Sequence, residues 1–272
     1  MGDWTPRELR FSNLGLRLIS SAVLIPLGLG AVWSGGWWLA VACALTAGVM
    51  AWEWGRISAY PQPPRFGLFA VLACLSLPLG SPALSAAIVA AGAAFAAIGA
   101  KGGIGYRGNA VFGLLYVTLM PVSLWLLREG PWDGRAAALY FMSFVWASDA
   151  AAYFTGRGIG GPRLLPKESP NKTWSGAVGA VVACIACGVA AAHIEHVPVV
   201  YWIATGIAIS VVAQIGDLFE SGMKRRFKVK DSGSVLPGHG GVMDRVDGLG
   251  AVAFVSTLLF HSVPKLPEML GL

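Results

Sequence analysis

The sequence predicts an all-α integral membrane protein with about nine transmembrane helices. Three observations lead to this fold class. Hydrophobic residues make up 56% of the chain and charged residues only 12%, and the mean hydropathy is +0.64. The apolar segments are long and show no two-residue alternation. Backbone groups inside a bilayer have no water to bind, so each span must satisfy its own hydrogen bonds, as helices do.

Taken in chain order, the apolar segments long enough to cross a bilayer define the predicted spans. They cover residues 14–33, 37–56, 66–80, 82–100, 109–127, 136–155, 174–193, 198–218 and 248–263. We divide the chain into N-terminal transmembrane helices, 1–135, and a C-terminal transmembrane region, 136–272. The C-terminal region contains two polar loops, 156–173 and 219–247.

The basic residues predict the orientation of these spans. With the N-terminus in the cytoplasm, alternation places 17 of the 20 Lys and Arg residues on the cytoplasmic side. This split is what the positive-inside rule requires. It places both polar loops, and any site they build at the ends of the C-terminal helices, in the cytoplasm. We therefore read the net charge of +6 as membrane orientation rather than nucleic-acid binding.

The first candidate site residue is Asp149, near the end of the sixth span in "FVWASDAAAYFTGR". A carboxylate within a span is costly and indicates function by default. The alternative is a helix-packing carboxylate paired with a nearby base such as Arg157.

The second candidate is the segment "KESPNKTWSG", residues 167–176. Lys167 and Lys172 flank the hydroxyls of Ser169 and Thr173, either of which could cap the seventh span. A helix N-terminus with lysines beside it suits phosphate oxygens. The alternative is an ordinary capped helix start at a basic membrane edge.

The third candidate lies in "QIGDLFESGMKRRFKVKD", residues 214–231. Asp217, Glu220 and Ser221 are three and four residues apart, so they share one helix face, and Lys224 continues it. Arg226 lies off this face and is expected to extend to lipid headgroups.

The fourth candidate is "KDSGSVLPGHGGVMDRVDG", which holds five glycines in residues 230–248. Tight backbone geometry around His239 is permitted by Pro237, Gly238, Gly240 and Gly241. Asp244 and Asp247 are three apart and would share a face at the start of the last helix. With Asp217 from a neighbouring helix they predict a hard-cation site, with magnesium the natural ion where phosphates complete the shell. The alternative is a surface cluster of Asp and Arg.

These residues spell a long pattern, S-x-x-K-R-x-x-x-x-K-D-x-G-x-x-L-P-x-H-G-G-x-x-D-R-x-D, over residues 221–247. It closely resembles the signature of the phosphatidate cytidylyltransferases, or CDP-diacylglycerol synthases. "GDLFES" and the "SPNKTW" loop also resemble that family, although the loop departs from its usual S-P-K-K-T-W-E-G at Asn171 and Ser175. The resemblance covers the chain from about Asp149 onward.

The resemblance implies a nucleotidyltransferase that transfers CMP from CTP to phosphatidic acid, giving CDP-diacylglycerol and pyrophosphate for phospholipid biosynthesis. Its partners would be CTP, phosphatidic acid and membrane lipid, with no nucleic acid, and a homodimer is left open. Its location would be a bacterial inner membrane. Magnesium would be the cofactor, with a second cation left open.

The expected roles divide the candidate residues into three groups. The expected metal ligands are Asp217, Asp244 and Asp247, with Asp149 nearby. Lys224 and Lys230 join the three ligands as catalytic residues. The expected substrate-binding residues are Lys167, Ser169, Lys172, Thr173, Ser221, Arg225, His239 and Arg245.

Two other functions fit parts of the pattern. A CTP-dependent lipid-alcohol kinase would use similar phosphate machinery. A cation-coupled transporter would use Asp149 and Asp217 as a relay, although the carboxylates gather at one membrane face. The segment "GRGIGG", residues 156–161, follows a span rather than a strand and is not a dinucleotide site.

The predicted orientation can be tested by labelling. In a variant without the four native cysteines, we expect a cysteine at position Gly160 or Val229 to react with a membrane-impermeant maleimide only from the cytoplasmic side. Labelling of either position in intact cells would contradict the orientation.

Overall fold

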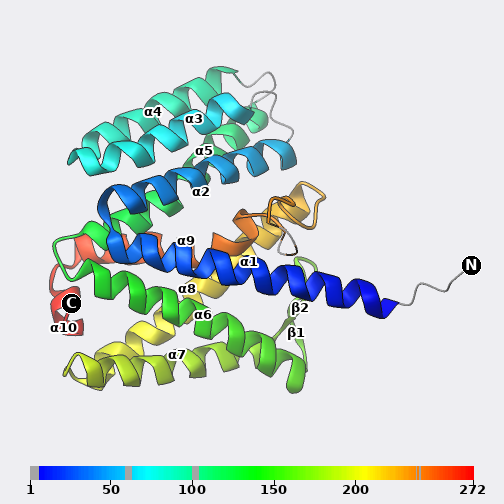
Figure 1. The fold of residues 1–272 in the computed structure, drawn as a ribbon, viewed down its shortest axis with the longest axis vertical. Helices are drawn as coiled ribbons and strands as arrows, with labels where there is room; N and C mark the ends of the chain where they lie inside the picture. The colour runs from blue at the N-terminus through cyan, green and yellow to red at the C-terminus, as the bar shows by residue number, and fades with distance from the viewer. Residues whose placement is uncertain (1–5, 59–62, 100–103, 237, 239) are drawn as a thin grey trace, which may run out of the picture.

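The fold is seen in a computed structural model that describes residues 6–58, 63–99, 104–236, 238 and 240–272 (Figure 1). The described N-terminal helices are α1 (Pro6–Ser34), α2 (Gly36–Ile57), α3 (Pro63–Ser76), α4 (Pro82–Gly99) and α5 (Ile104–Glu129), with a 3-10 turn, η1 (Leu77–Leu79), after α3. The rest comprises α6 (Gly134–Gly158), β1 (Arg163–Leu165), β2 (Ser169–Thr173), α7 (Trp174–Ile194), α8 (Val199–Arg226), α9 (Met243–Ser262) and α10 (Lys265–Leu270).

Each predicted span coincides with a helix in the described residues, so the all-α fold class is confirmed. The main differences lie at the polar loops. Helix α8 continues to Arg226 and α9 begins at Met243, which shortens the predicted loop 219–247 at both ends. The predicted loop 156–173 contains an antiparallel hairpin of β1 and β2, which the sequence did not indicate.

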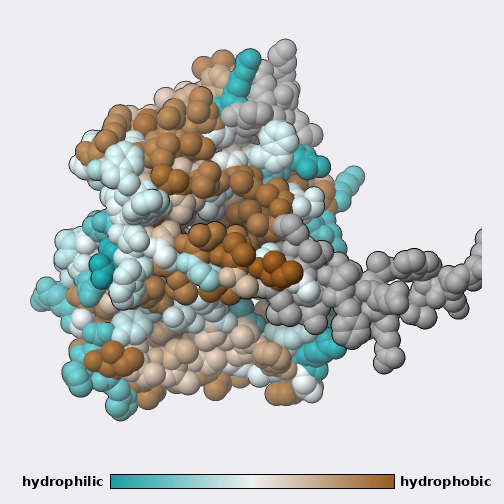
Figure 2. Space-filling view, in the orientation of Figure 1, coloured by the Kyte–Doolittle hydropathy of each residue, from teal (hydrophilic) through white to brown (hydrophobic). Residues whose placement is uncertain are grey.

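Five of the described helices are long and apolar enough to cross a membrane. They are α2, α4, residues Gly105–Glu129 of α5, α7 and α8. Two shorter apolar segments, Ile19–Ser34 and Gly67–Leu79, accompany them. Hydrophobic residues cover much of the visible face along the helices, and hydrophilic residues gather mainly toward their ends (Figure 2). The chain is therefore a helical membrane protein, while the count of nine spans stays a prediction.

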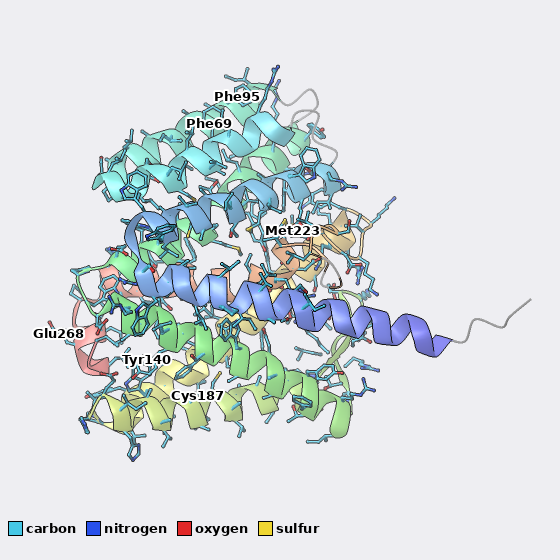
Figure 3. All side chains as sticks on the ribbon, viewed as in Figure 1. Phe69, Phe95, Tyr140, Cys187, Met223 and Glu268 are labelled. Atoms are coloured by element: carbon cyan, nitrogen blue, oxygen red, sulfur yellow. The ribbon has the colours of Figure 1, made fainter. Side chains whose placement is uncertain are left out.

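The helices form two groups, each around its own apolar core (Figure 1). One core lies mainly among α2 to α5 and also includes Met142 of α6 and Met243 of α9. Beside it, Phe69 of α3 and Phe95 of α4 pack with ring centroids 5.4 Å apart (Figure 3). The other lies among α6 to α9, where Tyr140 packs edge-on against Trp202 at 4.9 Å. Leu249 of α9 packs against both cores and so joins them.

Small residues bring α7 and α8 into close contact, as is common where membrane helices associate. A Cβ atom on Gly188 would lie 2.5 Å from the carbonyl oxygen of Trp202, and one on Gly206 would lie 2.5 Å from that of Cys184. No larger residue fits at either position without moving a helix. This contact holds α8 beside α7 and the hairpin that precedes it.

The functional segments lie at one end of the helices, on the right in Figure 1. The end of α2, the end of α6, the hairpin, the end of α8 and the start of α9 all reach this end. Thr173 links the hairpin to α7, because its hydroxyl accepts a hydrogen bond from the Gly176 amide at 3.1 Å. The prediction that Thr173 or Ser169 caps this helix is thus confirmed for Thr173.

Candidate active site

A cavity of about 1180 Å³ opens among the segments at this end. Helices α1, α6, α7, α8 and α9 contribute to its wall, together with the hairpin and the segment between α8 and α9. One part of the wall is apolar, with Leu24 and Ile25 of α1 and Trp146 of α6. The other part carries acidic and basic side chains. The cavity therefore offers both apolar and charged side chains to a bound molecule.

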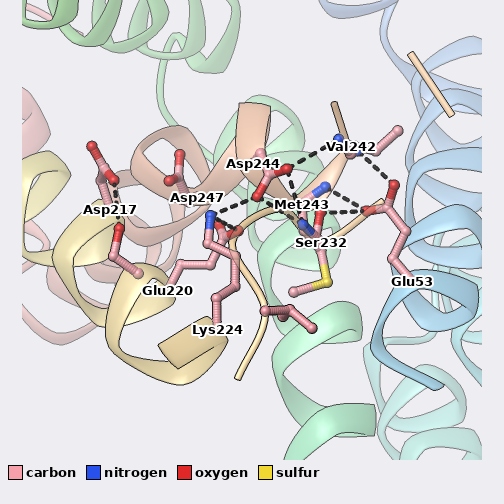
Figure 4. Close-up of polar contacts among 12 residues, drawn as sticks. Glu53, Asp217, Glu220, Lys224, Ser232, Val242, Met243, Asp244 and Asp247 are labelled. Atoms are coloured by element: carbon pink, nitrogen blue, oxygen red, sulfur yellow. Dashed lines mark hydrogen bonds and ion pairs between the residues drawn. The ribbon is translucent and has the colours of Figure 1, made fainter. Parts of the chain in front are cut away.

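A buried ion-pair network stands at the inner side of the polar wall (Figure 4). The Lys224 Nζ atom lies 2.6 Å from Asp244 Oδ1 and 3.1 Å from Glu220 Oε1. The side chain of Glu220 is 1% exposed and that of Lys224 is 11% exposed. Buried charges are costly without partners, so Lys224 stabilises both carboxylates. It also links α8, which carries Lys224 and Glu220, to the first turn of α9.

Asp244 is bonded on its other side to the polar segment before α9. Its Oδ2 atom accepts hydrogen bonds from the backbone amides of Gly241 at 3.0 Å and Ser232 at 3.1 Å. Gly238 and Gly240 have φ angles of 76° and 87°, which few other residues adopt. The prediction of tight backbone geometry in this segment is confirmed at these two positions.

A second group of carboxylates faces the cavity. Asp217 forms an ion pair with Lys172 of β2, and Ser221 donates a hydrogen bond to its Oδ1 atom at 3.5 Å. Asp247 accepts a hydrogen bond from the Gly248 amide at 2.7 Å and interacts electrostatically with Asp217 and Asp149. In the view of Figure 4, Asp247 lies on the Asp217 side of Asp244. Neighbouring like charges of this kind attract a cation or a cationic side chain.

A further carboxylate, that of Glu53, reaches the segment before α9 from α2. It is 1% exposed, and its Oε1 and Oε2 atoms accept hydrogen bonds from the amides of Val242 and Met243 at 2.8 and 2.9 Å. Oε2 also accepts one from the Ser232 hydroxyl at 3.2 Å. Ser232 is therefore bonded to Glu53 through its hydroxyl and to Asp244 through its amide.

The structure brings most of the predicted site residues to this one cavity. Nine of them line it: Asp149, Ser169, Lys172, Thr173, Asp217, Lys224, Asp244, Arg245 and Asp247. Four described residues do not line it, namely Lys167, Ser221, Arg225 and Lys230. Arg225 instead donates to the carbonyl oxygens of Glu168 at 3.2 Å and Val229 at 3.0 Å. His239 and Pro237 lie outside the described residues.

Among the residues that the structure describes, no group of three or more His, Cys, Asp or Glu side chains is arranged to hold a metal ion. Asp244 and Asp247 have different partners although both start α9. Asp244 is occupied by Lys224 and two backbone amides, whereas Asp247 faces Asp217. The assignment of metal ligands stays a prediction.

Comparison with known proteins identifies the family. The model of the cytidylyltransferase family matches residues 15–263. The chain belongs to the cytidylyltransferase family. Membership makes it an enzyme of the nucleotidyltransferase class, and the family predicted from the sequence is confirmed.

Two relatives of this cytidylyltransferase match nearly its whole length, and a third matches about half of it. A protein named phosphatidate cytidylyltransferase from Brucella abortus biovar 1 (strain 9-941) is 38% identical over 96% of this chain and 97% of its own. One of the same name from Brucella suis biovar 1 (strain 1330) is 40% identical over 95% of this chain and 97% of its own. Another from Haemophilus influenzae is 36% identical over 56% of this chain and 58% of its own.

Two site residues were not found from the sequence. Glu53 is a charged residue inside the second predicted span, so the rule that selected Asp149 applies to it equally. Ser232 carries no such signal, because a serine in a polar loop is ordinary. Glu220 was noted on the Asp217 face but received no role, and its place beside Lys224 depends on how α8 and α9 pack.

The basic side chains at the end of α8 should differ in importance for this cytidylyltransferase. Replacing Lys224 leaves two carboxylates without their cation, and breaking a buried pair costs about 3–5 kcal/mol. Arg226 is exposed. We expect Lys224→Met, which keeps the aliphatic stem, to lower the thermal unfolding temperature and cytidylyl transfer strongly.

The matched control is Arg226→Met, which should change neither quantity noticeably. Equal losses in the two variants would indicate that the basic run attracts lipid as a diffuse patch and that the Lys224 network has no special role.

Proposed function

We propose that this cytidylyltransferase transfers CMP from CTP to phosphatidic acid, giving CDP-diacylglycerol and pyrophosphate. The observation that carries the proposal is the identity of 38% over 96% of the chain to a protein named phosphatidate cytidylyltransferase. The cavity supports it independently. Its wall combines apolar helix faces with lysine and arginine side chains, which suits a substrate that is a phosphate joined to acyl chains.

The acyl chains of phosphatidic acid would lie along the apolar wall. Leu24 and Ile25 of α1 are 42% and 44% exposed, and Trp146 of α6 is 39% exposed. All three line the cavity, so an apolar chain could cover them while its phosphate meets the polar wall. Burial of apolar surface would then favour binding by about 25 cal/mol per Å² removed from water.

The phosphates would meet the basic part of the wall. Lys172 and Arg245 line the cavity and would neutralise the phosphates of CTP and phosphatidic acid as these polyanions approach each other. A phosphatidate oxygen would attack the α-phosphorus of CTP in line, and pyrophosphate would leave. A phosphate monoester has a second pKa of about 6 and is largely ionised near neutral pH. The chain therefore needs no general base for this step.

Magnesium fits the donor set of the cavity in chemistry. Asp217, Asp247 and Asp149 supply hard oxygen atoms on its wall, the ligand type that magnesium prefers together with substrate phosphates. We assign Asp217 and Asp247 as the residues that would hold it, with Asp149 nearby. Bound there, the ion would stabilise charge on the phosphates. Asp244 is better explained as the partner of Lys224, since its oxygens are already occupied.

We further propose that all nine helices α1 to α9 span a bacterial inner membrane and that the cavity faces the cytoplasm. The distribution of Lys and Arg supports this orientation. The convergence of both polar loops at one end of the helices supports it too (Figure 1). CTP would then reach the site from the aqueous side and phosphatidic acid from the membrane.

The proposed reaction can be tested with purified protein, phosphatidic acid and CTP labelled at either the α- or the γ-phosphate. We expect α-label in a CDP-lipid and γ-label in released pyrophosphate. In a parallel reaction with diacylglycerol, a lipid alcohol, in place of phosphatidic acid, transfer of γ-label to the lipid would identify a kinase. No transfer of α-label to phosphatidic acid would reject the proposal.

The two carboxylates of α9 should respond differently to substitution. We expect Asp247→Asn to fold normally but to lose activity by about a hundredfold or more, because its charge would no longer help to hold the ion. Raising the magnesium concentration should restore part of the loss.

Asp244→Asn should instead lower the unfolding temperature, since buried Lys224 loses a charged partner, and magnesium should restore little. Measurements of CDP-lipid formation and of thermal unfolding across a magnesium titration separate the two. Identical behaviour of both variants would contradict the division of roles.

A further inference from the structure

The carboxylate of Glu53 forms hydrogen bonds with a distant part of the chain rather than with its own helix. It lies in the last turns of α2, inside the N-terminal core, yet its carboxylate accepts hydrogen bonds from the segment around α9. The two amides that it binds, those of Val242 and Met243, are at the N-terminal end of α9. The first amides of a helix have no partner within the helix. A negative charge at that end is also favoured by the helix dipole.

The residue at the N-cap position of α9 does not cap these amides. Val242 occupies that position and makes no side-chain cap hydrogen bond. Within the described residues, the cap of this helix comes from a residue almost two hundred positions earlier in the chain. The N-terminal half of the chain therefore supplies the capping group that α9 lacks.

Two glycines of the signature, Gly233 and Gly241, leave space for this carboxylate because they have no side chain. A Cβ atom on Gly241 would lie 2.8 and 2.9 Å from the two Glu53 oxygens and 1.9 Å from the Ser232 hydroxyl. A Cβ atom on Gly233 would lie 2.8 Å from Glu53 Oε1. Neither glycine has a φ angle in the left-handed region, so backbone conformation does not require glycine at these two positions. The space taken by Glu53 requires glycine at position 233, and the Ser232 hydroxyl together with Glu53 requires it at position 241.

We propose that Glu53 is a positioning residue of the active site. It holds the N-terminal turn of α9 in place, together with the segment before it that carries Ser232, Gly233 and Gly241 (the glycine segment). Through Ser232 it is connected to Asp244, and through Asp244 to Lys224. The helix turn that it holds is the one that presents Asp244 and, one turn on, Asp247. A shift of this turn would displace both relative to Asp217 on α8.

The interaction requires a carboxylate rather than a group of the same shape. Glu53 faces three donors, two amides and a hydroxyl, and offers acceptors to all of them. Glutamine has the same volume but would turn its NH₂ group toward a backbone N–H, leaving a buried donor without a partner. Aspartate keeps the charge but is one methylene shorter. If the residue served only to fill space, glutamine would replace it best.

The first experiment reads the position of α9 directly and needs no activity. Hydrogen–deuterium exchange of the metal-free protein is compared in wild type, Glu53→Gln and Glu53→Ala. We expect the peptide containing Val242 and Met243 to exchange at least about tenfold faster in both variants, because its protection comes from the lost hydrogen bonds. Peptides from α7 should not change.

The matched control is Glu129→Gln. Glu129 also accepts a hydrogen bond from a backbone amide at a helix start, that of Gly36 at 2.8 Å. This hydrogen bond lies at the N-terminal end of α2, whereas Glu53 lies near its C-terminal end. Loss of the Glu129 carboxylate should therefore change hydrogen exchange near Gly36 only. Unchanged exchange at residues 242–243 in Glu53→Gln would overturn the proposal.

The second experiment is a double-mutant cycle on cytidylyl transfer, which rests on the proposed function, with rates normalised to correctly folded protein. We expect Glu53→Gln, Glu53→Ala and Gly233→Ala each to lower kcat by about tenfold or more. Gly222→Ala is the control for the glycine, since a Cβ there would meet only Glu168 at 3.9 Å, and it should be neutral.

The effects of Glu53→Ala and Gly233→Ala should not add, because the three atoms nearest to the added methyl group all belong to Glu53, and the methyl group would occupy the space that this side chain has left. Full additivity, or near-normal activity in Glu53→Gln, would overturn the positioning role. An inactive wild type would reject the proposed function alone, because the exchange result stands without it.

Discussion

The arrangement of the active site depends on buried carboxylates that must be satisfied at the edge of a membrane protein. Glu53 and Asp244 approach Ser232 from two sides, one through the hydroxyl and one through the amide. Lys224 then binds Asp244 and Glu220. A buried charge without partners costs several kcal/mol, so none of these residues can move alone. The network thereby joins α2, the glycine segment, α9 and α8 into one unit.

This network separates two kinds of carboxylate. Glu53 and Asp244 accept hydrogen bonds from backbone amides, and Asp244 and Glu220 form ion pairs with Lys224. Asp149, Asp217 and Asp247 line the cavity beside one another. Clustered like charges are unfavourable unless a cation joins them. The first kind supplies rigidity, and the second supplies the negative potential that a cation with phosphate substrates would neutralise.

The composition and spacing of the chain were sufficient to predict the helices and to choose most of the residues that line the cavity. Long apolar segments can satisfy their backbone only as helices, so the nine predicted ranges coincide with described helices. Polar residues are few in such a chain and stand out against it, which is why Asp149, Lys172, Asp217 and Lys224 could be chosen as candidates, while the roles expected for them come from the family resemblance. The hairpin of β1 and β2 was missed, because its short strands carry no alternating pattern.

What the sequence determined by itself was the fold class, the family and the kinds of group at the site, since these follow from local pattern. Tertiary structure alone decided which groups meet. Asp244 and Asp247 look equivalent in sequence, yet packing of α8 against α9 gives one a lysine and the other a neighbouring aspartate. Glu53 is distant in sequence from Val242 and Met243, and only the packing of α2 brings its carboxylate to their amides. Such partners depend on contacts between helices, and these contacts cannot be predicted from the spacing of residues within one segment of the sequence.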